Sequence, residues 1–350
     1  MKQAVILMET FLKTVAVFFA ILFIGSTVLA LAFYNVERSA FDAEFYIRAL
    51  DEENIYQRLP ELTAQSLAIA VQRSQGSSVL SIFRNLSEDE WRIFVTNLFP
   101  PDVLRGVAVD VVTQFMDYLN GERDNVVLSL SGIKAYLGSQ AGIDAIYGLL
   151  KTQPDCTIEQ LTVMATGQSD IVLCNPPETI LFIDVRPIYE AQIRAAVSVI
   201  PEQVMLISPG ADRTQQLQDL RFVRMVVRLS PILPTLCLLM VALFAVRSFA
   251  DWLNWWGYPM LIAGLISLFL SALSGFIAAG TFQLFITPVF PDLIPPAIVG
   301  VFRDLTATIV RNALQPSLLI AGVMAFFGFV MVVLAFVLRS RLRKKPQYVR

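Results

Sequence analysis

Four long apolar segments divide this chain very unevenly, and they constrain its fold more than any short motif does. They cover residues 14–33, 231–246, 259–285 and 318–338. The hydrocarbon core of a bilayer is roughly 30 Å thick, and a helix needs about 20 mostly apolar residues to cross it. Only 16% of the residues are charged, well below the share in a typical soluble domain. We therefore expect a mainly α-helical membrane protein with a four-helix transmembrane bundle.

The distribution of basic residues predicts the orientation of these spans. Five Lys and Arg side chains between Arg339 and Lys345 directly follow the last apolar segment, and such runs stay in the cytoplasm. Counting back four crossings also places the N-terminus inside and the residues between the first two spans outside, in the cell envelope. The expected regions are a cytoplasmic N-terminus (1–13), a first span (14–33), a mostly helical extracytoplasmic domain (34–228), a membrane domain (229–338) with an outer interfacial loop (286–314), and a basic cytoplasmic tail (339–350).

The first apolar segment has two interpretations. Ala30 and Ala32 resemble the small residues of a signal-peptide cleavage site. The apolar run before them is longer than the usual core of a signal peptide, which favours an uncleaved signal anchor. Cleavage would leave three spans and the same outer domain.

Charge and composition exclude several classes of function. Residues 34–228 contain 16 Lys/Arg and 25 Asp/Glu, a net charge of −9, which argues against a nucleic-acid partner. The chain has no histidine, so Ser-His-Asp and Cys-His catalysis and histidine-based zinc sites are excluded within it. It also lacks a phosphate-binding loop and a dinucleotide fingerprint. We expect no cofactor, no metal and no catalytic residue set.

Two cysteines of the expected outer domain lie 18 positions apart. Cys156 and Cys174 would meet an oxidising compartment and can pair in a disulfide, whereas two unrelated buried thiols are the alternative. Cys237 lies in the second apolar segment, where a small apolar packing role is expected.

Helix signals dominate the outer domain. We expect helices at 39–50, 52–73, 87–97, 100–120, 133–137, 143–151, 157–165 and 187–200, with at most two short strands, at 125–131 and 180–185. The acidic clusters at 51–53 and 88–90 are interpreted as helix starts, where carboxylates complement the helix dipole. Paired carboxylates for hydrolysis are the alternative, although no spacing selects a pair.

Three arginines recur just before the second span. Arg221, Arg224 and Arg228 share one helix face at the outer membrane surface, and the pattern predicts contact with lipid phosphates or another anion. Snorkelling and pairing with nearby acidic residues such as Asp219 is the plainer alternative.

The later segments carry packing and interface signals. Small residues at every fourth position predict close helix packing: Ser267, Ser271, Gly275 and Ala279 in segment three, and Ser317, Ala321 and Ala325 in segment four.

Rings with a polar edge favour the headgroup zone. The connection after segment two contains Trp252, Trp255, Trp256 and Tyr258. These residues predict an aromatic belt at a short turn on the inner face, and a ligand-stacking site is the alternative. A separate amphipathic surface helix is expected at 298–314, and a buried helix of the outer domain is the alternative.

The sequence favours a non-catalytic binding, scaffold or assembly protein. Its expected partners are the lipid bilayer and another membrane or envelope protein. A transporter or lipid-handling protein is the second hypothesis, weakened because the apolar cores hold no ionisable side chain apart from the thiol of Cys237. A carboxylate-based extracytoplasmic hydrolase is the third, and it requires two acidic residues in one cleft.

Overall fold

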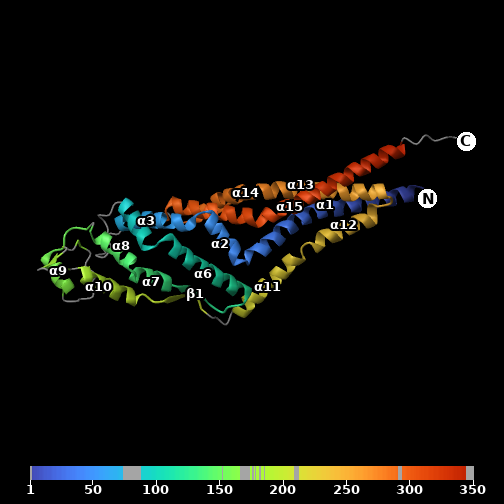
Figure 1. Cartoon of the computed structure of the whole chain (residues 1–350). Helices are drawn as coiled ribbons and strands as arrows, with labels where there is room; N and C mark the ends of the chain where they lie inside the picture. Colours follow the sequence, from blue (N-terminus) through green and yellow to red (C-terminus); the bar gives the residue numbers. More distant parts are fainter. Residues whose placement is uncertain are drawn as a thin grey trace. The chain divides into compact units, whose positions relative to one another are not determined.

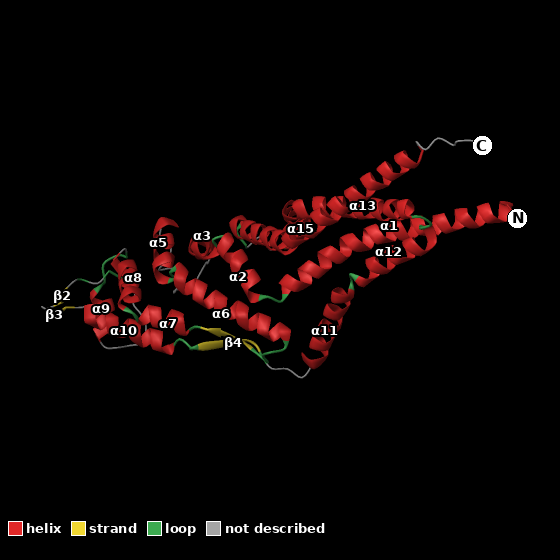
Figure 2. Cartoon of the chain, turned by 45° about the vertical axis from the view of Figure 1, so that its right-hand side comes forward, coloured by secondary structure: helices red, strands yellow, loops and turns green. Residues whose placement is uncertain are grey.

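The computed structural model describes residues 2–73, 88–151, 153–165, 174–175, 177, 179–180, 183–184, 186–208, 213–290 and 294–343. The chain divides into two compact units. The span unit comprises Met1–Phe45, Ala211–Thr287 and Arg303–Arg350, and the head unit comprises Tyr46–Gly210 and Pro288–Phe302. Most described residues are helical, as expected (Figures 1 and 2).

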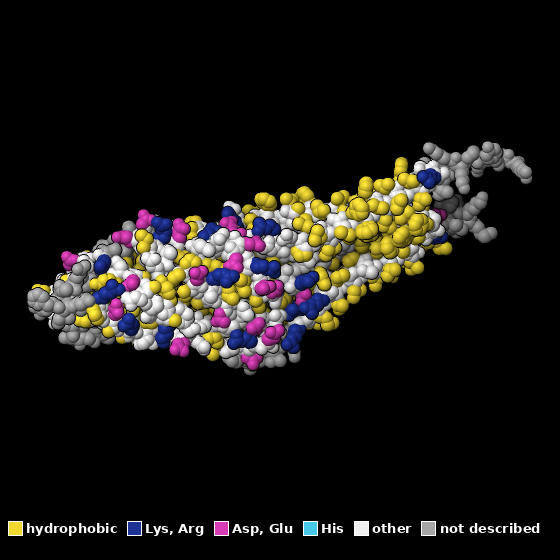
Figure 3. Space-filling view, viewed as in Figure 1, with side chains coloured by type: hydrophobic (Ala, Val, Ile, Leu, Met, Phe, Trp, Pro, Cys, Tyr) yellow, Lys and Arg dark blue, Asp and Glu magenta, His cyan; other side chains and the backbone are white. Residues whose placement is uncertain are grey.

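The helices of the span unit contain four stretches that are long and apolar enough to cross a membrane, as the sequence predicts. These candidate spans are Leu7–Ala40, Asp219–Ala245, Phe249–Ala272 and Pro296–Arg341. On the face seen in Figure 3, hydrophobic side chains gather over the right-hand part of the molecule. The elements are α1 (Lys2–Ala40), α11 (Arg213–Leu229), α12 (Ile232–Ala245), α13 (Phe249–Ala272), α14 (Ser274–Thr281) and the π-helical η2 (Phe282–Ile286). The 3-10 turn η3 (Thr287–Val289) and the helix α15 (Pro296–Arg343) each include residues of both units.

One expectation for the span unit is wrong. The sequence predicts a surface helix at 298–314 and a separate last span, but both belong to α15, a single helix of 48 residues. Pro316 lies inside this helix and removes one backbone hydrogen bond without ending it. A proline within a membrane helix is tolerated when neighbouring groups satisfy the freed carbonyl.

Helices α13 and α15 approach each other closely at glycines. A Cβ built on Gly264 would lie 2.6 Å from Ala325 N, and one built on Gly328 would lie 2.5 Å from Leu261 N. Backbones this close need glycine on one side, because a methyl group has no room. Helix α1 packs beside α12 and α13, where Phe23, Cys237 and Ala263 form a buried cluster.

The head unit is built mainly of helices that bury small apolar clusters against one another. Its helices are α2 (Ala43–Glu52, which begins in the span unit), α3 (Ile55–Arg73), α5 (Glu88–Leu98), α6 (Pro101–Asn120), α7 (Ser131–Gly138), α8 (Gln140–Lys151), α9 (Ile158–Ala165) and α10 (Arg186–Val199). Helix α6 ends as predicted, because Gly121 adopts φ 79°, a left-handed conformation that favours glycine.

Four short strands form two antiparallel pairs, whereas the sequence predicts at most two strands. Strand β1 (Val126–Ser129) pairs with β4 (Gln203–Ile207), and β2 (Thr179–Ile180) pairs with β3 (Ile183–Asp184). Figure 2 shows the β4 ribbon in yellow. Strand β4 forms where the apolar run Val204–Ile207 lies between Pro201 and Pro209 in the sequence.

The interpretation of the acidic cluster at 51–53 as a helix start is also wrong. Asp51 and Glu52 lie in the last turn of α2, and α3 begins at Ile55. Asp51 instead accepts two hydrogen bonds from Arg105 of α6, at 3.0 and 2.9 Å. That partner offsets the unfavourable position of a carboxylate at a helix C-terminus. The second cluster, at 88–90, does open α5, whereas its expected capping residue Ser87 lies outside the described residues.

Candidate functional site

The head unit contains an apolar groove of about 260 Å³ between its helices. Nearly all of its lining is hydrocarbon or aromatic, and Gln192 supplies the one amide side chain. The lining residues come from α5 (Phe94, Leu98), α7 (Leu137), α8 (Ile146, Leu150) and α10 with its following residue (Tyr189, Gln192, Ile193, Ala196, Val197, Ile200). Such a groove can bind a ligand that presents apolar groups.

The wall on α10 is a helical stripe. Tyr189, Ile193, Ala196 and Val197 recur at intervals of three and four residues, which brings them to one face. Ile193 and Val197 are buried with Leu137 and Ile143 in one cluster, so the groove lies on a packed base.

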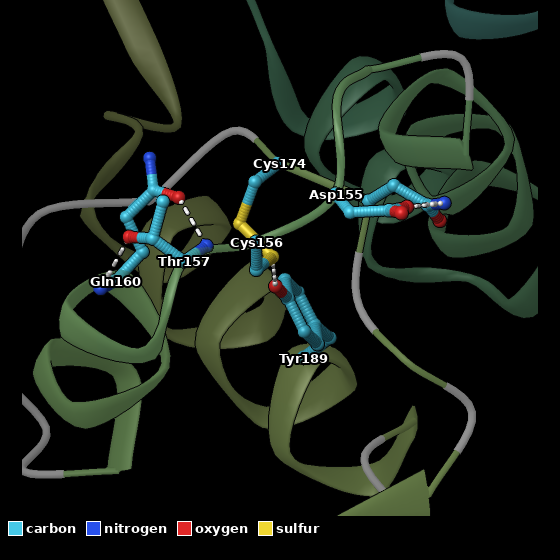
Figure 4. Close-up of a disulfide and its surroundings, with 7 residues drawn as sticks. Asp155, Cys156, Thr157, Gln160, Cys174 and Tyr189 are labelled. Carbon is cyan, nitrogen blue, oxygen red and sulfur yellow. Dashed lines mark hydrogen bonds between the residues drawn. A yellow bond between two sulfur atoms is a disulfide. The ribbon is translucent and has the colours of Figure 1, made fainter.

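A disulfide lies directly behind this wall. Cys156 and Cys174 are bonded to each other, and the Oη atom of Tyr189 lies 3.7 Å from Cys156 Sγ (Figure 4). The bridge is flanked by an isolated parallel pairing of Asp155 with Asn175, whose side chains share a 2.8 Å hydrogen bond. The alternative of two unrelated thiols does not describe this structure. The disulfide thus links residues 156 and 174 beside the α10 wall of the groove.

Tyr189 is only 1% exposed although it is the largest side chain of the wall. Burial, with a smaller contribution from Tyr147, raises the pKa of Tyr189 to about 12. Its phenol therefore stays neutral over the physiological range and contributes packing area to the groove.

Charged side chains of α10 form ion pairs with one another and with α8. Arg186 forms ion pairs with Asp144 and Glu190, and Arg194 pairs with Glu190 at 3.3 Å. Hydrogen bonds from Gln140 and Arg186 lower the pKa of Glu190. These groups fix α8 to α10 at the edge of the groove.

A second, smaller pocket of about 210 Å³ shares Phe94 with the groove. Its lining includes the carboxylates of Glu90 and Asp144 together with Asn97. Asp144 accepts hydrogen bonds from Arg186 and from Gln140, at 3.3 Å for Gln140. A carboxylate with a cationic partner is typical of a structural ion-pair network.

The arginine cluster lies in the span unit, on α11. Arg224 and Arg228 each donate Nε to Glu37 Oε1 at 3.1 Å, and the Arg224 guanidinium lies 3.8 Å from the Phe41 ring centroid. Arg221 is exposed and forms no ion pair within the described residues. Sequence reasoning missed Glu37 because it lies beyond the first apolar segment and 187 positions before Arg224.

Most of the small residues that were predicted to pack the transmembrane helices against one another are buried. Ser267, Ser271, Ser317 and Ala321 are buried, Ala325 is 9% exposed, and Gly275 lies under the side chain of Arg311. Ala279 is half-buried. Ser317 Oγ accepts a 2.9 Å hydrogen bond from Asn35 Nδ2 of α1. Among the described glycines of the span unit, the closest contacts lie at Gly264 and Gly328, which the ladder starting at Ser267 did not include.

The predicted aromatic belt belongs to a helix and not to a turn. α12 ends at Ala245 and α13 begins at Phe249, so the first turns of α13 carry the expected residues Trp252, Trp255, Trp256 and Tyr258. Ser248 caps this helix by accepting a hydrogen bond from the Asp251 backbone at 3.1 Å, which allows the helix to begin before the aromatic residues.

A mainly helical chain with four helices long and apolar enough to cross a bilayer has the features of a multi-pass membrane protein. No protein-family model, characterised protein or solved structure matches it significantly.

Proposed function

We propose that this chain is a non-catalytic, four-span membrane protein of the cell envelope whose head unit lies outside the cytoplasm and captures an amphipathic helix of a partner protein. The apolar groove between α5, α8 and α10 is the observation that carries the proposal. Binding at this groove would give the protein a scaffold or assembly role.

The dimensions of the groove suit a helix. Its α10 wall extends from Tyr189 to Ile200, which corresponds to about 16 Å at 1.5 Å per residue, or three helical turns. Helices that dock in grooves insert apolar side chains at positions i, i+3 or i+4, and i+7. Three turns are long enough to receive these anchors.

The surroundings of the groove favour a helix over a single acyl chain. Val199 is 81% exposed and Ile93 is 57% exposed, and each adjoins a lining residue in sequence. An acyl chain would leave these side chains in water, whereas a helix about 10 Å wide can cover them. The net charge of −9 over residues 34–228 favours basic flanks on the partner and disfavours an anionic lipid.

A matched pair of variants tests the groove. Ala196 lines it, whereas the adjacent Ala195 is exposed and does not. Ala196→Phe fills the groove and Ala195→Phe adds the same ring outside it. The probe is a fluorescent Lys/Leu peptide with helical amphipathic periodicity, and a scrambled peptide of identical composition is its control.

We expect the full-length protein in detergent to bind the amphipathic peptide and not the scrambled one. Ala196→Phe should weaken binding at least about tenfold, the loss of one anchor contact, and Ala195→Phe should leave it unchanged. Equal binding of both peptides, or an unchanged affinity in Ala196→Phe, would contradict the proposal. A fluorescent fatty acid that binds more tightly than the peptide would instead support lipid handling.

The second pocket supports one other candidate, a carboxylate hydrolase, because Glu90 and Asp144 line it together. This candidate predicts glycoside or ester hydrolysis by the purified protein. It also predicts that Glu90→Gln removes that activity, whereas the proposed function predicts no such activity.

A further inference from the structure

Helix α11 has two chemically different faces. Arg221, Arg224 and Arg228 share one face at positions i, i+3 and i+7. The other side carries apolar residues that are about half exposed or more: Phe222, Val223, Met225, Val226 and Leu229. Exposed apolar side chains beside arginines are typical of a helix that meets acyl chains and headgroups together.

Glu37 of α1 forms ion pairs with two side chains of the arginine face and so holds them in place. The Glu37 side chain is 7% exposed, and its Oε1 atom accepts the Nε–H groups of both Arg224 and Arg228. Arg228 is 60% exposed and engages Glu37 through Nε, so the outer Nη edge of its guanidinium remains available. Two guanidinium groups therefore share one carboxylate, and Arg221 on the same face forms no ion pair among the described residues, so the face carries more positive charge than Glu37 neutralises.

The length of the candidate span that includes α11 places the arginine cluster at the edge of the bilayer. The candidate span that includes α11 is Asp219–Ala245, 27 residues long, whereas about 20 cross the hydrocarbon core. Its first turns, which carry Arg221 and Arg224, extend past the hydrocarbon towards the headgroups. Arginine side chains at such a boundary reach the plane of the lipid phosphates.

We propose that Arg221 and Arg228, with Glu37 and Arg224 as positioning residues, bind the phosphate of an anionic phospholipid. The apolar residues on the same turns favour a lipid over free phosphate, because Phe222, Met225 and Leu229 can contact the acyl chains of the same molecule. This site lies within the span unit and does not depend on the proposed function of the groove.

The test measures lipid retention by native mass spectrometry of the full-length protein. The protein is reconstituted in phosphatidylcholine vesicles with and without phosphatidylglycerol, then extracted in mild detergent. The test variant is Arg221→Gln/Arg228→Gln. The control, Arg194→Gln, removes an equally exposed positive charge from the head unit. Inorganic phosphate is added as a competitor in a parallel sample.

Wild type and Arg194→Gln should retain phosphatidylglycerol, and the double variant should lose it by about tenfold, the effect of one charge-assisted contact. Equal retention in all three proteins would overturn the proposal, as would an equal loss in Arg194→Gln. Displacement of the lipid by inorganic phosphate would overturn the assignment to a lipid. If the double variant does not fold, Arg221→Gln alone serves, because Arg221 has no ion pair among the described residues.

Glu37→Gln separates positioning from net charge. This variant makes the cluster more positive but removes the carboxylate that holds two guanidinium groups. Positioning predicts reduced phosphatidylglycerol retention in Glu37→Gln, whereas simple attraction by net charge predicts an increase. An increase would overturn the role given to Glu37.

Discussion

Tyr189 Oη lies 3.7 Å from Cys156 Sγ, so one wall of the groove packs directly against the disulfide. The contact joins the covalent link between residues 156 and 174 to the buried face of α10. Loss of the disulfide should therefore affect both the stability of the head unit and the order of the groove.

The first prediction concerns this disulfide. A bridge that closes a loop of 18 positions contributes about 3 kcal/mol in the loop-entropy model. Cys156→Ser/Cys174→Ser should destabilise the head unit by that order and increase hydrogen exchange in α10, measured by mass spectrometry on the full-length protein. Alkylation of the denatured, unreduced protein should label only Cys237 among the three cysteines, because Cys237 is buried in the folded state. Labelling of all three in the unreduced protein would contradict the pairing.

A second prediction concerns the contact between α13 and α15. Gly264→Ala places a methyl group 2.6 Å from the Ala325 backbone, and overpacking of this kind costs about 1–3 kcal/mol. We expect a lower thermal unfolding midpoint in detergent. Gly322→Ala is the matched control on α15, because its new methyl group would lie 3.9 Å from Leu268 Cδ1, an ordinary contact. Equal midpoints for the two variants would show that the helices do not pack closely at Gly264.

The buried hydrogen bond between Asn35 and Ser317 gives a third prediction. Interhelical hydrogen bonds in membrane proteins contribute about 0.6 kcal/mol on average, with a maximum near 1.7. A double-mutant cycle of Asn35→Ala and Ser317→Ala should give a coupling energy within that range. The cycle is measured by reversible unfolding in mixed micelles. Additive effects of the two variants would mean that the 2.9 Å contact does not stabilise the packing of α1 against α15.

The ion pair between Asp51 and Arg105 predicts a pH dependence. The hydrogen bond from Arg105 lowers the pKa of Asp51 below its ordinary 3.8. A lowered pKa in the folded state contributes stability above the ordinary value, and that stability is lost as the pH falls through the folded pKa. Asp51→Asn should therefore reduce the loss of head-unit stability on acidification below 3.8, measured by thermal unfolding. Arg105→Gln should have the same effect. If both variants lose stability on acidification as the wild type does, the ion pair does not cause the pH dependence.

Local patterns predicted many of the elements but did not identify the sites. Length and hydropathy predicted the four candidate spans, and Gly121 predicted the end of α6 because both signals lie within a few turns of sequence. The groove combines Phe94, Ile146 and Ile193, whose proximity depends on how α5, α8 and α10 pack. Periodicity marks each of these faces as apolar but does not identify which faces leave a gap between them.

The arginine cluster illustrates the same limit for polar residues. The spacing of Arg221, Arg224 and Arg228 predicted a shared helix face. Glu37, the carboxylate partner of the second and third of these arginines, lies on another helix. Asp219, the partner suggested by nearness in sequence, forms no ion pair with them among the described residues. A tertiary contact of this kind needs the packing of α1 against α11, which no local pattern specifies.

The orientation of the chain in the membrane underlies the disulfide, the lipid site and the partner, and cysteine labelling in intact cells tests it most directly. Val199→Cys introduces an exposed thiol in the head unit, and Ser340→Cys introduces one beside the basic tail. A membrane-impermeant maleimide should label Val199→Cys in intact cells and Ser340→Cys only after permeabilisation. Labelling of Ser340→Cys in intact cells, with Val199→Cys protected until permeabilisation, would contradict the account.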